Sequence, residues 1–232
     1  MASPIFNPYI FQITSGSNME KRHYSPADLL ISNLDQALRT LFGQPEITER
    51  HNPAEDIEES ELTKTEIQHI AGLMRVNHTG EVCAQALYQG QALTAKLPKV
   101  KQSMQRAAQE ENDHLDWCHA RLQEFDSHTS YLNPLWYAGS LAIGATAGLI
   151  GDKWSLGFVA ETENQVVKHL DSHLQQVPEN DKRTRAILEQ MKTDEEHHGT
   201  TAINAGGAQL PEPVKKLMGL TSKIMTSIAY RV

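Results

Sequence analysis

Apolar residues recur along most of this chain at the three- and four-residue spacing of amphipathic α-helices, and no convincing run alternates as a β-strand does. Ser25-Pro26 offers an N-cap followed by proline at the first helical position, and Thr63-x-x-Glu66 fits a capping box. We therefore expect an all-α protein. The pattern predicts helices over residues 25–43, 63–96, 100–125, 154–177 and 181–204, and a last amphipathic segment over 211–232.

The segments outside these helices set the expected domain organisation. Residues 44–61 are polar and acidic and are interpreted as a linker. Residues 1–24 are expected to form a flexible N-terminal extension, and residues 25–232 a single helical domain, since 232 residues fit one domain. The N-terminus shows neither the charged start of a secretory signal nor the arginines of a mitochondrial presequence.

Composition narrows the function classes. The chain has 21 basic and 29 acidic residues and a net charge of −8, which argues against nucleic-acid binding. Its 2 cysteines, Cys83 and Cys118, are too few for a disulfide framework or a cysteine-rich zinc site, and favour a reducing compartment.

The apolar face of each long predicted helix holds one glutamate: Glu81, Glu111, Glu163 and Glu195 in chain order. A carboxylate facing a bundle core is costly unless it is paired, protonated or bound to a metal. Four such residues, one per helix, indicate a shared cause. Their apolar neighbours on the same faces are Ile70, Met74, Ala84 and Tyr88 for Glu81; Met104, Ala107, Ala108, Leu115 and Cys118 for Glu111; Leu156, Val159, Ala160, Val166, Val167 and Leu170 for Glu163; and Leu188, Met191, Ala202 and Ile203 for Glu195.

Two of these glutamates are followed three residues later by a histidine, in the pairs Glu111-His114 and Glu195-His198. Residues three apart lie on the same face of a helix, so both side chains of a pair can reach one ion. The same spacing at Glu20-His23 and Glu66-His69 is better explained by chance and by helix capping.

The spacing of the four acids predicts that they meet at one level. Glu81 and Glu111 lie at similar distances on either side of Pro98, and Glu163 and Glu195 on either side of the turn at Pro178. Two hairpins then bring four glutamates and two histidines to the midplane of a bundle, the ligand set of a di-iron carboxylate site. Carboxylate-rich sites with one imidazole per ion suit iron or manganese, whereas zinc more often uses thiolates and magnesium rarely takes imidazole.

The acids that precede two of these ligands, Glu110 and Asp194, are candidates to accept the free N–H of a ligand histidine from another helix. Ordinary solvated charges are the alternative. His78 and His169 are candidates to assist proton or electron movement, with a role in packing or hydrogen bonding as the simpler interpretation.

Four stretches resemble the demethoxyubiquinone hydroxylases of ubiquinone biosynthesis: residues 72–85 (GLMRVNHTGEVCAQ), 110–114 (EENDH), 157–170 (GFVAETENQVVKHL) and 194–198 (DEEHH). The resemblance implies a ferritin-like four-helix bundle with a long apolar crossover, extra N- and C-terminal helices, and no catalytic residue beyond the metal centre. Glu161 is the alternative to Glu163 as the metal ligand of this helix, but it lies off the apolar face. The resemblance places two Fe²⁺ ions on Glu81, Glu111, His114, Glu163, Glu195 and His198.

This family implies hydroxylation of a polyprenyl 3-demethoxyubiquinol, 2-polyprenyl-3-methyl-6-methoxy-1,4-benzoquinol, with O₂. The expected partners are the membrane-embedded quinol, O₂, the membrane surface and other quinone-biosynthesis proteins. The alternatives are an iron-storage or peroxide-scavenging protein of the same fold and a non-enzymatic scaffold for quinone biosynthesis. A storage cage has no need of an apolar crossover, and an intact six-ligand set argues against a scaffold.

Two segments are candidates for membrane contact. Residues 133–150 (NPLWYAGSLAIGATAGLI) are uncharged and border on a spanning length, but they also suit a helix in the membrane interface or one that packs through small residues. Residues 211–232 carry four basic residues against Glu212 and an apolar side, which is typical of membrane-surface contact, of a bundle cap or of partner binding. We expect peripheral attachment to the cytoplasmic side of a bacterial inner membrane.

Overall fold

The computed structural model describes residues 25–43, 45–48 and 50–232, so the expected extension over 1–24 lies outside the described residues. Within them the chain forms only helices, as predicted. These are α1 (Pro26–Phe42), α2 (Lys64–Thr94), α3 (Pro98–Glu124), α4 (Asn133–Ile150), α5 (Asp152–Leu174), α6 (Lys182–Asn204) and α7 (Glu212–Ala229).

Local chemistry explains where the helices begin. Thr63 and Glu66 form the predicted capping box, in which each side chain accepts a hydrogen bond from the other residue's backbone N–H. Ser25 forms a second capping box with Asp28 at the start of α1. Asp181 caps α6 by accepting from the backbone of Thr184 at 3.0 Å.

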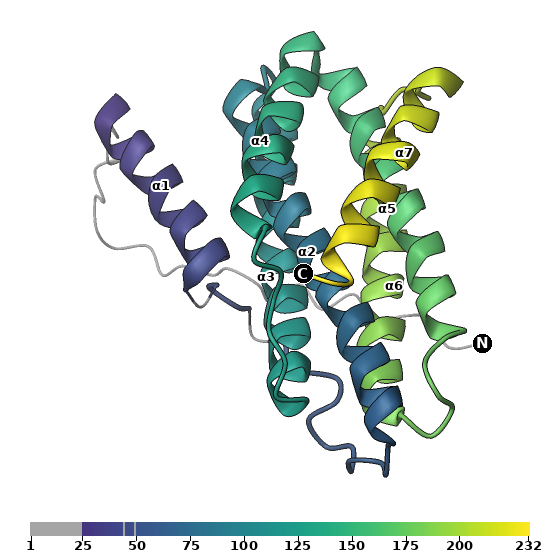
Figure 1. Ribbon diagram of the computed structural model, residues 1–232. Coiled ribbons are helices and arrows are strands. Elements are labelled where there is room, and N and C mark those ends of the chain that lie inside the picture. Colours follow the sequence, from purple (N-terminus) through teal and green to yellow (C-terminus); the bar gives the residue numbers. More distant parts are fainter. Residues whose placement is uncertain (1–24, 44, 49) are drawn as a thin grey trace, which may run out of the picture.

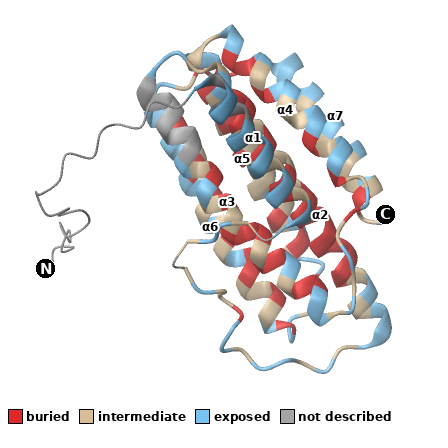
Figure 2. Ribbon diagram, turned by 90° about the vertical axis from the view of Figure 1, so that its left-hand side faces the viewer, coloured by how far each residue is buried: buried red, intermediate tan, exposed pale blue. Residues whose placement is uncertain are grey.

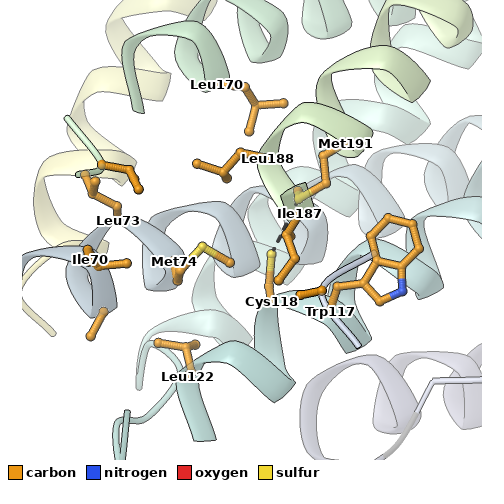
Figure 3. Packing of buried hydrophobic residues seen from close by; sticks show 13 residues of the cluster. Ile70, Leu73, Met74, Trp117, Cys118, Leu122, Leu170, Ile187, Leu188 and Met191 are labelled. Carbon is orange, nitrogen blue, oxygen red and sulfur yellow. Dashed lines mark hydrogen bonds between the residues drawn. The ribbon is translucent and has the colours of Figure 1, made fainter. Parts of the chain in front are cut away.

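Two hairpins, α2–α3 and α5–α6, form the four-helix bundle, and α4 links them (Figure 1). Buried positions gather between the four helices, and exposed positions lie on their outer sides (Figure 2). At one end of the bundle, side chains from all four helices interlock in an apolar cluster that includes Met74, Leu122, Leu170 and Leu188 (Figure 3). Close packing of this kind fixes the height at which the helices meet.

Helix α4 packs along α2 through glycines. A Cβ on Gly90 would overlap the backbone of α4, and one on Gly144 would overlap the backbone of Leu87. The opposite side of α4 exposes Leu135, Leu149 and other apolar residues. Among the residues that the structure describes, no helix combines the length and hydropathy that crossing a membrane requires. The segment 133–150 therefore packs through small residues on one side and presents an apolar surface on the other.

The N- and C-terminal helices, α1 and α7, lie on different sides of the four-helix bundle. Helix α1 lies at one edge of the molecule, whereas α7 runs over α2 and α5 (Figure 1). The end of α7 is fixed to α2, because Arg75 donates to the carbonyl of Tyr230 at 2.9 Å and a nitrogen of His69 lies 2.7 Å from the Tyr230 hydroxyl.

Two expectations need correction. Ile203, predicted on the buried face of α6, is 48% exposed, because its neighbour Ala202 faces the interior and the next residue of a helix points about 100° away. The segment between α1 and α2 is more than a polar linker: Ala54 is buried in the main apolar cluster, and Arg50 donates to Asp194, next to the predicted ligand Glu195. The side chain of Met104 lies outside the described part.

Candidate metal centre

The four bundle helices bring all six predicted ligands to the interior. Helix α2 supplies one, α3 two, α5 one and α6 two, and none is more than 7% exposed. In chain order they are Glu81, Glu111, His114, Glu163, Glu195 and His198. Within the described residues, atoms of four of them, Glu81, Glu111, His114 and Glu195, all lie within 4.8 Å of one another.

The middle of the centre is nearly symmetric. Nδ1 of His114 lies 3.0 Å from Glu111 Oε2 and 3.4 Å from Glu195 Oε1. Nδ1 of His198 lies 3.1 Å from Glu195 Oε2 and 3.2 Å from Glu111 Oε1. Each of these two glutamates therefore presents one oxygen to each imidazole, the geometry expected of carboxylates that bridge two ions.

The other two glutamates lie at the ends of this arrangement. Glu81 Oε2 is 3.9 Å from His114 Nδ1. Glu163 lies outside the closest group, and its carboxylate accepts a hydrogen bond from the hydroxyl of Tyr88. Glu161, the competitor on the same helix, faces α7 instead, where its carboxylate lies 3.9 Å from Lys215 Nζ.

The outer nitrogens of both imidazoles meet carboxylates from the opposite hairpin. His114 Nε2 lies 2.9 Å from Asp194 Oδ2, and His198 Nε2 lies 2.8 Å from Glu110 Oε2. These are the two acids that the sequence marked as candidates. Such contacts orient an imidazole so that its other nitrogen, here Nδ1, points into the centre.

Four buried carboxylates close together make the centre attractive to a cation. Burial and the charge of Glu111 and Glu195 raise the pKa of Glu81 well above its ordinary value. Burial and the same two neighbours also raise the pKa of Glu163. In addition, Glu111 Oε1 is buried and makes no well-aligned hydrogen bond, although His198 Nδ1 lies 3.2 Å away. A divalent ion bound here would relieve the repulsion and satisfy that oxygen.

The donor set fits iron or manganese. Four carboxylates and two imidazoles would offer each of two ions one nitrogen and several oxygens, and the described residues contribute no thiolate to the centre. The arrangement therefore fits a pair of redox-active ions better than a structural zinc.

A cavity of about 310 Å³ leads to the centre from between α2, α4, α5 and α7. Glu81, Glu163 and Glu195 lie at its inner end. The rest of its wall is mostly apolar and includes Leu87, Ile143, Phe158, Val166, Leu217 and Met225. A space of this size and lining suits a small ring system with an apolar substituent.

His78 and His169, the two candidates for proton or electron movement, differ in their surroundings. His169 lines the cavity, and its Nε2 is buried without a hydrogen-bond partner. His78 is buried beside α4, where its Nδ1 lies 3.4 Å from the side-chain nitrogen of Asn133. A role in proton or electron movement stays a prediction for both.

The sequence pattern does not identify the role of three residues near the centre. Tyr88 lies on the predicted apolar face, but the spacing gives no sign of its contact with Glu163. Arg50 and Asp113 form an ion pair beside His114, with Arg50 Nε 2.6 Å from Asp113 Oδ2. Helical periodicity places Asp113 next to the ligands, but no local signal shows which distant residue meets it.

The chain matches the family model described as "Ubiquinone biosynthesis protein COQ7" over residues 68–229, more than half of its length. It is 60% identical over 219 residues to a 3-demethoxyubiquinol 3-hydroxylase of Alcanivorax borkumensis, which covers 92% of this chain and 100% of that protein. Proteins of the same name from Stutzerimonas stutzeri and Nitrosococcus oceani are 60% and 58% identical, each over 91% of this chain and 99% of the relative.

Proposed function

Because this chain belongs to the COQ7 family of ubiquinone biosynthesis proteins, we propose that it is a 3-demethoxyubiquinol 3-hydroxylase. The reaction inserts one atom of O₂ at the unsubstituted carbon of the quinol ring and releases the other as water. Each turnover consumes two electrons and two protons, so an external two-electron donor has to return the metal centre to its reduced state. The observation that carries the proposal is the buried carboxylate–histidine centre at the inner end of an apolar cavity.

We assign two Fe²⁺ ions to the six buried side chains: Glu81, Glu111, His114, Glu163, Glu195 and His198. A bound pair of ferrous ions would supply electrons and open coordination positions for dioxygen. Glu111 and Glu195 would contribute to both ion positions, since each of them contacts both imidazoles.

The chain's other side chains hold the centre and the ring in place. Asp194 and Glu110 fix the orientation of His114 and His198 through their outer nitrogens. The hydroxyl of Tyr88 donates a hydrogen bond that holds Glu163 at the inner end of the cavity. The apolar cavity wall excludes water and leaves the electron-rich ring beside the three glutamates at its inner end.

Because the polyprenyl tail of the substrate lies in the bilayer, we expect the cavity entrance to face a membrane surface. Helix α7 exposes Leu217, Leu220 and Ile224 beside Lys215 and Lys223, and α4 exposes further apolar residues. We assign this surface, formed by the exposed sides of α4 and α7, to peripheral contact with the cytoplasmic face of a bacterial inner membrane.

The function is tested by quinone profiling and iron analysis in a strain that lacks the gene. Such a strain should accumulate demethoxyubiquinone, and this chain should restore ubiquinone. Glu163→Ala should abolish restoration and lower the iron content of the purified protein. Glu161→Ala, two residues away but facing α7, is the matched control and should retain both.

Two results would overturn the assignment. If Glu163→Ala keeps both its iron and its hydroxylation, the ligand set is wrong. If the wild-type protein binds iron and consumes peroxide but leaves demethoxyubiquinone unchanged, a storage or scavenging role on the same fold replaces the hydroxylase.

A further inference from the structure

Arg50 joins the segment before α2 to the two helices that carry the histidine ligands. Its Nε lies 2.6 Å from Asp113 on α3, and its Nη1 lies 2.7 Å from Asp194 on α6. Its Nη2 donates to the carbonyl of Glu110 at 3.2 Å. One planar guanidinium therefore connects α3 with α6 through three hydrogen bonds in fixed directions.

These contacts reach His114 by two routes. Oδ2 of Asp194 accepts from Arg50 and also lies 2.9 Å from His114 Nε2. The guanidinium carbon lies 5.2 Å from the ring centre of Trp117, which in turn lies 5.3 Å from the ring centre of His114. The outer nitrogen and one face of this imidazole are thus both set by groups that Arg50 holds.

The segment that carries Arg50 is itself anchored at the same place. The backbone N–H and the hydroxyl of Thr48 both donate to Asp113, each at 2.7 Å. Asp113 is fully buried, so these donors and Arg50 take the place of water around its carboxylate. The described residues of this segment, 45–48 and 50–61, therefore form a strap across the His114 side of the centre.

Among the residues that the structure describes, no such strap reaches the opposite histidine, His198. Glu110, the partner of His198 Nε2, is contacted by Arg106 Nε at 2.7 Å. Arg106 lies one turn away on the same helix and its side chain is 61% exposed, whereas that of Arg50 is 33% exposed. An exposed pair within one helix is screened by water and holds its partner weakly. The near-symmetry of the six ligands does not extend to the groups around them.

We propose that Arg50 is a positioning residue that makes the two ion positions unequal, with the strap holding the His114 position in its binding geometry and leaving the His198 position free to adjust. The inference rests on the proposed di-iron function. It deepens that function by assigning the tighter ion to the His114 side and by giving the segment before α2 a role in metal retention.

The test is anaerobic titration of the full-length apoprotein with Co²⁺, followed by absorption and equilibrium dialysis. Wild type should bind two ions in two resolved steps. Arg50→Ala should weaken the tighter step by about tenfold, the lower end of the usual effect of removing such supporting groups, and should alter its absorption band. The weaker step should change by less than about twofold. Arg106→Ala, the matched control at Glu110, should leave the tighter step unchanged.

Added methylguanidinium should restore the tighter step in Arg50→Ala, which a general loss of packing would not allow. If Arg50→Ala does not fold, Arg50→Lys can be used instead. It keeps the positive charge but lacks the planar guanidinium with its several N–H donors, and should weaken the same step. Two equal steps in wild type, or equal weakening of both steps in the Arg50 variants, would refute the inference. Failure of wild type to bind two ions would instead refute the proposed function.

Discussion

Buried histidines in this protein fall into two kinds, according to what surrounds them. Burial disfavours the charged form of His114, but hydrogen bonds to Asp194 and Glu111 outweigh it and raise the pKa of this imidazole. His173 is also buried, and its Nδ1 has no hydrogen-bond partner. Burial, together with His169 and His69, lowers the pKa of His173 to about 3. The carboxylates around the first kind would also attract a metal cation, which displaces the proton from the imidazole, whereas the second kind makes folding sensitive to acid.

His173 should therefore destabilise the protein as the pH falls. Between its ordinary pKa of 6.5 and its folded pKa of about 3, the unfolded chain binds a proton that the folded chain does not. The free energy of unfolding then drops by up to about 1.4 kcal/mol per pH unit below pH 6.5. His173→Leu removes this proton and should flatten the decline, as measured by urea unfolding from pH 7 to pH 5.

The matched control is His51→Leu. The side chain of His51 is 91% exposed, so its replacement should leave the pH dependence as in wild type. A stability difference between His173→Leu and wild type that stays constant across this pH range would show that His173 is not the group responsible.

At the scale of elements, the contact between α2 and α4 depends on glycine. A Cβ on Gly144 would overlap the carbonyl of Leu87, so Gly144→Ala must push α4 away from α2. We expect a loss of about 1–3 kcal/mol in unfolding free energy, the usual cost of overpacking, measured by chemical denaturation. Gly139→Ala lies on the same helix with open space around it and should stabilise by about 0.5–1 kcal/mol. Equal effects of the two substitutions would contradict the close packing of α4.

The order and approximate ends of the helices could be predicted from the sequence, because apolar spacing and caps such as Thr63 are local signals. The common level of the six proposed ligands followed from their spacing around two turns. Contacts between remote segments could not be predicted in this way. Tyr88 and Glu163 are 75 residues apart, and Arg50 and Asp194 are 144 apart, so only the packed bundle shows that they meet.

Charge and apolar surface are unevenly distributed over the whole molecule. The chain has a net charge of −8, yet its last helix carries Lys215, Lys216 and Lys223. The same helix exposes apolar residues and covers one side of the cavity. A cationic helix with an exposed apolar side on an acidic protein orients the molecule on an anionic surface, with the cavity entrance close to the lipid.

The orientation proposed above predicts that α7 dominates vesicle binding. Leu220 and Ile224 are exposed and lie outside the cavity wall, so the double variant Leu220→Glu/Ile224→Glu should keep its fold and iron content. Its affinity for anionic vesicles, measured by co-sedimentation, should fall at least about tenfold. The reason is that each apolar side chain that enters the lipid surface contributes about 1.5–3 kcal/mol to binding.

The control for this experiment carries the same added charge elsewhere. Ile47→Glu/Ile203→Glu changes two residues that are similarly exposed, one in the strap and one on α6, and should bind vesicles as wild type does. If both double variants lose binding equally, general charge repulsion rather than a specific face explains the loss. If neither loses it, α7 does not contact the membrane, and a bundle cap or a partner-binding helix becomes the better interpretation of residues 211–232.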